Sequence, residues 1–383
     1  MNQSSSKQQP FVISISGKTL AEIVPFGTNR VAPVSLVANQ LYSLSRFAYL
    51  HTQDGQIVLE SPLAHCRITL PDTRSLAILH ALSSPQTTAE LGDRFGDFPQ
   101  DVLDTFLSWL LGEKFLTASD EEETALGLWE FHDLLFHSRS RLGRHNYPYG
   151  KNHSHKDKIE PLPAVKPSVS SSSISLYQPD IEALMDSDIP FTRVMEQRRS
   201  QRQQGKQPIT VEQLGEFLYR TARIRSLKTS ESAEYEFSDR PYPSGGACYE
   251  LELYLAINAC QGLAPGLYYY RPKEHLLDRL NGYTSDVFKL SCQATTESGL
   301  PQVLIILAAR FPRVTWKYCS LSYSLILKHV GVLYQSMYLV STAMGLACCA
   351  IGGGNSDLFT QATGIDYQIE TSVGEFILGS KAE

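Results

Sequence analysis

Three short segments in the second half of this 383-residue chain carry side chains that could bind an anion or move a proton. Arg198-Arg199-Ser200-Gln201-Arg202 offers guanidinium groups that bind phosphate oxygens in bidentate fashion, and a hydroxyl group that can add a hydrogen bond. Pro243-Ser244-Gly245-Gly246 offers a turn-forming backbone, and Lys317-Tyr318 offers two groups that exchange protons. The three segments predict an anion-binding site with an acid/base pair beside it.

Each segment also has a plainer structural interpretation. Arginine clusters commonly form solvated helix ends, Pro-Ser-Gly-Gly could be only the turn before a strand at Glu250, and Lys-Tyr can be a packed pair. Gly352-Gly353-Gly354 does not complete a dinucleotide-binding loop, because the G-x-G-x-x-G spacing places its third glycine at Asp357. We also expect this triplet to follow a helix instead of a strand, so no Rossmann domain is predicted.

The composition excludes several classes of protein. With 42% hydrophobic and 19% charged residues the chain can bury a core, and its net charge of -6 disfavours a general nucleic-acid binder. Seven scattered cysteines form no C-x-x-C pair, so neither a metal site nor a disulfide scaffold is predicted and a reducing cytoplasm is expected. The polar N-terminus lacks the apolar core of a signal peptide.

One uncharged stretch, Val330 to Ser356, is long enough to cross a membrane. It contains Gln335 and several hydroxyl side chains and ends in the three glycines, which favours a helix buried in a core or a subunit interface. No membrane segment is therefore predicted.

The pattern of the first 175 residues changes twice. Residues 1–71 are strand-like, and residues 72–120 read as three helices followed by an apolar run, with helices expected over 74–82, 88–95 and 100–111. This succession resembles a winged helix. Eight acidic residues stand against three basic ones there, so a peptide-recognition or purely structural module is favoured over DNA binding.

Residues 121–175 are expected to form a helix and then a linker. The helix should cover about residues 126–143; His132 and His137 lie about 140° apart on it, which disfavours a metal site. The Pro- and Ser-rich stretch from Glu160 to Ser173 is the predicted domain boundary. Residues 176–383 then mix helices, expected over 181–199, 211–223 and 320–346, with strands, so the predicted class is α+β.

Arg-Arg-Ser-x-Arg, Pro-Ser-Gly-Gly-Ala and the late Gly-Gly-Gly-Asn together resemble the nitroreductase-type flavin fold in its SagB-type dehydrogenase branch. The resemblance covers about residues 180–380, and the end of the chain is most similar to thiazoline oxidases of the cyanobactin pathways. It implies FMN as the cofactor and a homodimer in which each flavin contacts both chains. Many members of the fold continue past the last strand with a basic tail, whereas this chain offers only Lys381 there.

The resemblance also implies roles for individual residues. Arg198, Ser200 and Arg202, helped by Arg199, would bind the phosphate and ribityl chain. The ring system would be approached from the partner subunit by Pro243, Ser244 and Gly245, and the backbone of Gly352, Gly353 and Gly354 would approach its edge.

Lys317-Tyr318 matches a Lys-Tyr pair that azoline oxidases associate with proton removal from carbon. Tyr318 would be the general base, with its pKa lowered by the Lys317 ammonium, or the roles would be reversed.

The leading hypothesis is an FMN-dependent oxidase of thiazoline or oxazoline rings in ribosomally made peptides, with dioxygen as the electron acceptor and a cyclodehydratase as a candidate partner. One alternative keeps the fold but reduces quinones or nitro compounds with NAD(P)H. Another is a non-enzymatic peptide-binding protein.

Overall fold

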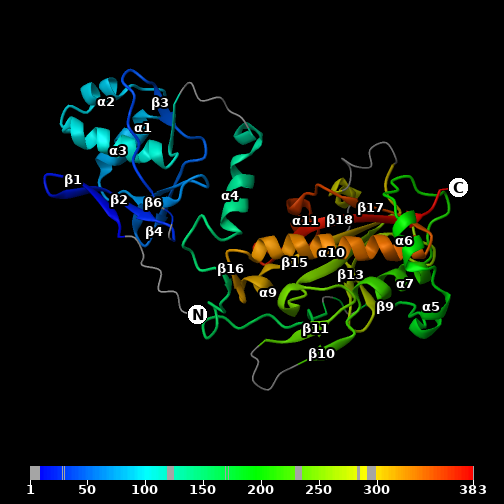
Figure 1. The fold of residues 1–383 in the computed structure, drawn as a ribbon. Coiled ribbons are helices and arrows are strands. Elements are labelled where there is room, and N and C mark those ends of the chain that lie inside the picture. Colours follow the sequence, from blue (N-terminus) through cyan, green and yellow to red (C-terminus); the bar gives the residue numbers. More distant parts are fainter. Residues whose placement is uncertain are drawn as a thin grey trace. The chain divides into compact units, whose positions relative to one another are not determined.

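A computed structural model describes residues 9–27, 29, 31–118, 125–168, 170, 172–228, 235–282, 285–290 and 299–382. The chain forms two compact units, residues 1–150 and 151–383 (Figure 1). The division falls at Gly150, ahead of the predicted connection at 160–173. Residues of that connection bind to the second unit, where Lys166 Nζ donates to Glu370 Oε2 over 2.6 Å.

The first unit combines a five-stranded sheet with three helices. The sheet has the order β1-β2-β6-β5-β4, and its strands are β1 (Phe11–Ile15), β2 (Lys18–Pro25), β4 (Tyr49–Gln53), β5 (Gln56–Glu60) and β6 (Cys66–Thr69). A separate pair joins β3 (Tyr42–Leu44) to β7 (Leu116–Ala118). The three helices between them are α1 (Thr73–Ala81), α2 (Thr88–Arg94) and α3 (Gln100–Gly112).

The sequence explains where these helices begin and what they bury. Asp72 caps α1 by accepting from the Arg74 amide, and Thr87 and Glu90 form a reciprocal capping box at α2. Leu103, Phe106 and Leu110 of α3 join the core formed with the sheet.

The three helices lie close to their predicted ranges. The expected fourth helix is shorter, with a 3-10 turn η1 (Ala125–Leu128) followed by α4 (Phe131–Arg139).

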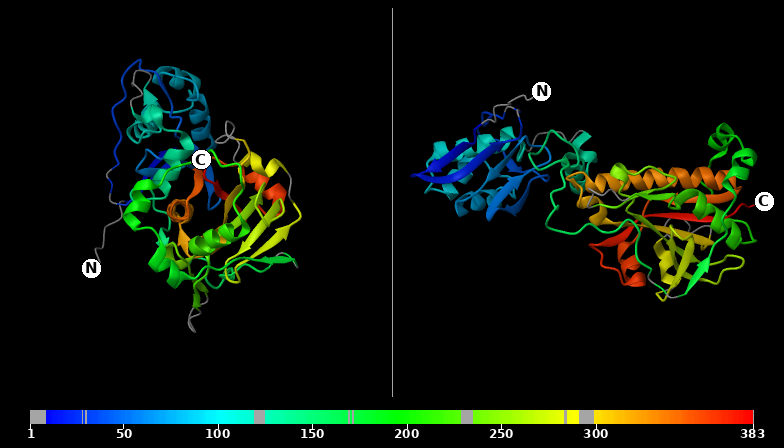
Figure 2. Two further views of the ribbon diagram at one scale, coloured as in Figure 1. Left: turned by 90° about the vertical axis from the view of Figure 1, so that its right-hand side faces the viewer. Right: turned by 90° about the horizontal axis from the view of Figure 1, so that it is seen from below.

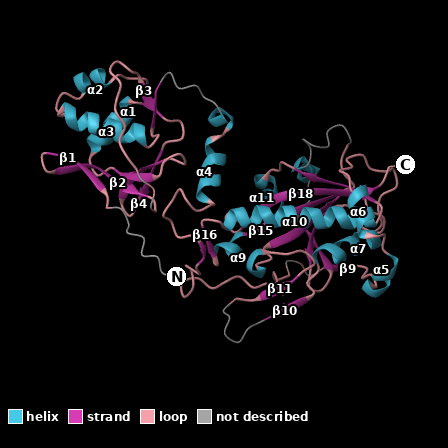
Figure 3. Ribbon diagram, in the orientation of Figure 1, coloured by secondary structure: helices cyan, strands magenta, loops and turns pink. Residues whose placement is uncertain are grey.

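The second unit is built on a seven-stranded sheet with the order β17-β18-β15-β12-β13-β14-β9, in which neighbouring strands are antiparallel (Figure 3). The strands are β9 (Ser173–Ser175), β12 (Leu251–Ile257), β13 (Gly266–Arg271), β14 (Leu276–Leu280), β15 (Val303–Arg310), β17 (Leu346–Ile351) and β18 (Glu370–Ser380). Short strands β10 (Ser226–Lys228) and β11 (Phe237–Asp239) form a separate hairpin, and β8 (Gly150–Lys151) and β16 (Tyr318–Cys319) have two residues each.

Both faces of this sheet are covered. Leu253 and Leu255 of β12 pack with α7 (Val211–Ala222) and α10 (Ser322–Ala343), whereas the alternating Tyr254 faces α11 (Ser356–Thr363) and η3 (Ser285–Leu290). Figure 2 shows α10 and α11 on opposite sides of the sheet. The remaining helical segments are α5 (Ile181–Ser187), α6 (Phe191–Gln197), η2 (Gly245–Ala247) and α9 (Phe311–Thr315).

The structure corrects two expectations. The helix predicted over 181–199 is two helices, because Pro190 disfavours helical backbone at the residue before it and becomes the N-cap of α6. Gly352-Gly353-Gly354 follows strand β17, not a helix. The antiparallel sheet nevertheless has no parallel β-α-β unit of the Rossmann type among the described strands.

Two further findings concern membranes and metals. The described helices include none with the length and apolar character needed to cross a bilayer. Across the described ranges, no three His, Cys, Asp or Glu side chains gather as a metal site would require. Six cysteines are free thiols, and Cys292 lies outside the described residues.

Candidate active site

The Pro243–Tyr249 loop has an unusual backbone. The backbone of this loop has φ angles of 61° at Gly246, 51° at Ala247 and 44° at Tyr249. These lie in the left-handed region, which residues other than glycine rarely adopt. Ser244 closes the loop, since its Oγ accepts from the Tyr249 amide over 3.0 Å and its carbonyl accepts from the Ala247 amide over 3.0 Å. Such strained geometry persists only where neighbouring groups hold it.

Lys317 is one of the groups that hold this loop. It follows α9, and its Nζ donates to the carbonyl oxygen of Gly246 over 2.6 Å. The ammonium nitrogen also lies 4.1 Å from the ring centroid of Tyr235 and 4.5 Å from that of Phe237. The residue is 2% exposed. Burial lowers the pKa of Lys317, and the charges of Lys151 and Arg313 act in the same direction.

Tyr318 lies on the same side of the loop. A methyl group placed on Gly246 would overlap Tyr318 Oη and would lie 3.4 Å from Lys317 Nζ, so the phenol and the amine flank one point above this glycine. Burial raises the pKa of Tyr318, and the Cys248 thiol acts in the same direction. The expected lowering of the tyrosine pKa by its lysine neighbour is therefore not found.

The arginine segment begins where α6 ends, as the sequence predicts. The guanidinium of Arg198 lies 5.2 Å from the ring centroid of Tyr338 on α10, and Ser200 Oγ is 2.9 Å from the hydroxyl of Tyr338. That hydroxyl accepts from the Ala350 amide over 2.8 Å, and the Gln201 amide donates to Cys348. The segment is thus tied to the C-terminal half of α10 and to β17.

Phosphate is a good chemical fit for this segment. Among the described residues, the guanidinium groups of Arg198, Arg199 and Arg202 form no ion pair with a carboxylate. Unpaired guanidinium groups beside a serine hydroxyl form the donor set that a phosphate group requires.

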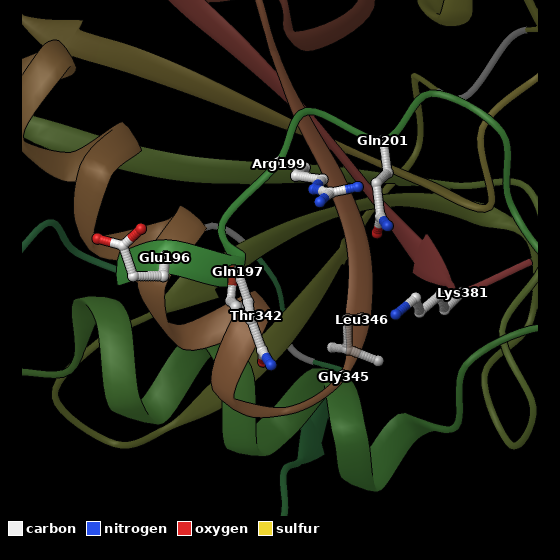
Figure 4. A pocket seen from close by; sticks show the side chains of 8 residues that line it. All are labelled: Glu196, Gln197, Arg199, Gln201, Thr342, Gly345, Leu346 and Lys381. Carbon is white, nitrogen blue, oxygen red and sulfur yellow. The ribbon is translucent and has the colours of Figure 1, made fainter. Parts of the chain in front are cut away.

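A cavity of about 420 Å³ opens beside the arginine segment (Figure 4). Arg199 and Gln201 line it from the segment, Thr342 lines it from the last turn of α10, and Leu346 lines it from the start of β17. Lys381 also lines it, so the one late basic residue shares a cavity with Arg199. Figure 4 shows its amine extending toward Leu346.

Gly354, the last of the three glycines after β17, approaches a buried carboxyl group. A methyl group on Gly354 would overlap the carboxylate of Glu375, which β18 places beneath the loop. Burial raises the pKa of Glu375 to about 7, and a hydrogen bond from Ser372 opposes that rise. Sequence reasoning missed Glu375, since nothing in its spacing connects it with the glycines.

The predicted residues gather in two places within one chain. Ser244 and Gly245 lie with Lys317 and Tyr318, and this group contacts α10 at His329. The arginine segment contacts α10 at Tyr338, nine residues further on, which corresponds to roughly 13 Å along a helix axis. Within one chain the arginine segment and the Lys-Tyr pair therefore lie at two separate positions along α10.

Comparison with known proteins gives matches in both units. Residues 42–146 match the family model of the cyanobactin oxidase ThcOx, and residues 195–380 match that of the nitroreductase family. A nitroreductase-like protein of Methanocaldococcus jannaschii, MJ1384, is 27% identical over 184 residues, which are 47% of this chain and 84% of that protein.

Two solved structures are also similar. One is a nitroreductase-like protein of Ralstonia eutropha, with 21% identity, 62% of this chain and 100% of that chain covered, and a TM-score of 0.45. The other is a chain of the Escherichia coli microcin synthetase McbBCD complex bound to truncated pro-MccB17. It has 16% identity, 69% of this chain and 100% of that chain covered, and a TM-score of 0.42.

The fold and the family models define an oxidoreductase of mixed α+β class with a nitroreductase domain in its C-terminal unit. Its N-terminal unit carries the cyanobactin oxidase ThcOx domain, over residues 42–146. This pair of domains implies flavin-dependent azoline oxidation.

Proposed function

We propose that this chain binds FMN and oxidises thiazoline, and also oxazoline, rings of a modified peptide to thiazoles and oxazoles. The observation that carries the proposal is the buried Lys317 held against the Pro-Ser-Gly-Gly loop with Tyr318 beside it. A flavin reductase needs only an open flavin face, whereas ring oxidation also needs a group that removes a proton from carbon.

The arginine segment and Lys381 are the proposed phosphate-binding residues. Arg198, Ser200 and Arg202 would contact the phosphate and the ribityl chain, with Arg199 and Lys381 facing them from the adjoining cavity. The unpaired guanidinium groups support this assignment. Ser244, Gly245 and the backbone of Gly352–Gly354 would approach the ring system.

Lys317 is the proposed general base and Tyr318 the proposed hydrogen-bond donor. A neutral amine can take the Cα proton of the azoline ring, and the lowered pKa of Lys317 increases the neutral fraction at a given pH. The raised pKa of Tyr318 keeps its phenol protonated, so that it can orient the ring by donating a hydrogen bond. FMN held by these residues would supply an acceptor for the hydride from Cβ and a route for the two electrons to dioxygen, which would yield hydrogen peroxide.

A homodimer would complete the site. We infer that a partner subunit contributes to each flavin site, as the resemblance to the nitroreductase fold implies. One face of α10 suits such a contact: Tyr323 and Leu327 are 47% and 39% exposed, and Gly331, on the same stripe, has open space around its Cα.

The N-terminal unit is the proposed peptide-docking module. Helices α1 to α3 followed by β7, which pairs with β3, have the succession of a winged helix. A cavity of about 490 Å³ lies beside this strand pair and is lined largely by apolar side chains, among them Val34, Val37, Leu111 and Leu116. A cyclodehydratase that forms the azoline rings is the proposed supplier of the substrate.

The test is incubation of the purified protein with a thiazoline-containing peptide in air, without NAD(P)H. The proposal predicts that the peptide loses two hydrogens per oxidised ring and that hydrogen peroxide accumulates. A protein that reduces quinones with NAD(P)H but leaves the peptide mass unchanged would contradict it.

A further inference from the structure

Beneath the Pro-Ser-Gly-Gly loop lies a buried carboxyl-imidazole pair that has no role in the site described above. Glu250, just before β12, is 0% exposed, and His329, on α10, is 5% exposed. The Nδ1 atom of His329 lies 2.7 Å from Glu250 Oε1, and its Nε2 atom accepts from the amide of Gly245 over 2.7 Å.

These contacts fix the protonation of the imidazole ring. A backbone amide can only donate, so Nε2 must be the unprotonated, accepting nitrogen. Nδ1 then carries the proton and donates it to Glu250. Both hydrogen bonds therefore run in one direction, from the Gly245 amide to the imidazole and from the imidazole to Glu250. With a proton on only one ring nitrogen, His329 is neutral.

The same chain of contacts continues to Lys317. The Gly245 amide is held by His329, and the carbonyl of the next residue, Gly246, accepts from Lys317 Nζ over 2.6 Å. Between these contacts the backbone turns into the left-handed region, with φ of 61° at Gly246. The loop is thus held from one side by His329 and presents a carbonyl to the amine on the other.

Stability alone does not explain a buried carboxylate at position 250. Its Oε2 atom is buried and accepts no hydrogen bond within the described part of the chain, although burying a carboxylate with an unsatisfied oxygen is costly. An apolar side chain would fill the same space at lower cost, so the placement of an acceptor opposite Nδ1 requires another reason.

We propose that Glu250 and His329 are positioning residues, which hold the backbone of Gly245 and Gly246 so that the Gly246 carbonyl fixes Lys317 Nζ where the substrate proton is removed. Only the predicted effect of these two residues on turnover depends on the proposed azoline oxidation. Its effect on the loop can be measured without substrate.

A matched pair of substitutions separates positioning from simple packing. His329→Asn places an amide where Nδ1 stands, so Glu250 keeps its donor while the Gly245 amide loses its acceptor. His329→Gln places an amide where Nε2 stands, so Gly245 keeps an acceptor while Glu250 loses its donor. If the loop contact matters, His329→Asn is the damaging change; if satisfying the buried carboxylate matters, His329→Gln is.

The first measurement is hydrogen exchange by mass spectrometry on the purified, flavin-loaded variants, followed in peptides that span residues 243–250. His329→Asn should speed exchange there, and His329→Gln should not. The second is turnover of a thiazoline peptide: kcat should fall on the order of 100-fold in His329→Asn with little change in KM, the size expected for a misplacement of about 1 Å. Unchanged exchange and kcat in His329→Asn would overturn the proposal, as would equal effects of the two variants.

Glu250 supplies a second test if a His329 variant does not fold. Glu250→Ala removes the acceptor that orients the ring and should speed exchange in the same peptides, whereas Glu250→Gln keeps an acceptor and should restore slow exchange. Equal exchange in these two variants would overturn the positioning role. His275→Asn is the control, because His275 is also buried and makes two hydrogen bonds, to Tyr270 and to the Tyr177 carbonyl, away from this loop. If the parent protein leaves the peptide unchanged, the proposed function fails, while the exchange data still test the loop contact.

Discussion

Replacing Gly246 by alanine tests whether the point between Lys317 and Tyr318 is the reacting position. The added methyl group would overlap Tyr318 Oη and would lie 3.4 Å from Lys317 Nζ, so at least the tyrosine has to move. Gly246 also has a φ of 61°, at which an alanine is strained. The substitution therefore has a backbone effect and a separate effect on the site.

The two effects differ in size and in what they change. The left-handed backbone costs an alanine about 1 kcal/mol of stability, which lowers the Tm of a domain of this size by roughly 2 to 4 °C. Displacing Tyr318 by about 1 Å should lower kcat on the order of 100-fold. We therefore expect a small loss of stability and a large loss of turnover in Gly246→Ala.

Gly364→Ala is the matched control. Gly364 has a φ of 71° at the end of α11, and a methyl group there meets no atom within 4 Å, so only the backbone cost applies. Thermal unfolding and turnover of a thiazoline peptide are measured for both variants. The reasoning is refuted if Gly246→Ala keeps as much turnover as Gly364→Ala, because the two variants share the backbone cost and differ only in the contact with Tyr318.

Three further predictions follow from the site. Lys317→Met should lower kcat by about 100- to 10,000-fold without loss of flavin. In the parent protein kcat should rise with pH, because the neutral amine is the active form. It should level off below the ordinary lysine pKa of about 10.4, because burial lowers the pKa of Lys317. A flat pH profile from pH 6 to 10, or full activity in Lys317→Met, would contradict this role. Arg198→Gln should weaken flavin retention about 10-fold or more in equilibrium dialysis. The control is Arg225→Gln, at an exposed arginine paired with Asp239, which should retain flavin like the parent protein. Equal retention by the two variants would contradict a phosphate site at Arg198. Glu375 has its pKa raised from 4.5 to about 7, so its folded state favours the protonated form and its contribution to stability is lost as the pH rises through 7. Glu375→Gln should therefore be more stable than the parent at pH 8, by a margin on the order of 3 kcal/mol, and about as stable as the parent at pH 4.5. Thermal unfolding at the two pH values measures this difference. A difference that does not depend on pH would argue against a titrating Glu375.

Sequence patterns located the elements well where local rules act alone. The three helices of the first unit begin and end within about one residue of the predicted ranges. The strand Leu346–Ile351 was read as the end of a helix because its apolar residues continue directly from those of α10. An apolar run of this length does not distinguish the two structures, and only pairing with β18 makes it a strand.

The candidate site shows a similar division. Motif resemblance indicated the arginine segment, the loop and Lys317-Tyr318, and the structure brings the last two together. Glu250 and His329 could not be found from spacing, because they meet only when β12 and α10 pack, 79 positions apart in the sequence. A histidine beside a long uncharged stretch was the one local signal for that pair.

The central claim is that this flavin-type fold carries a carbon-dehydrogenating site built on Lys317. The most direct test is the mass of a thiazoline peptide after incubation with the flavin-loaded parent protein in air, beside the Lys317→Met variant at equal flavin content. The account predicts a loss of two hydrogens per ring with the parent protein and an unchanged peptide over the same time with the variant. Equal conversion by both proteins, or none by either, would contradict it.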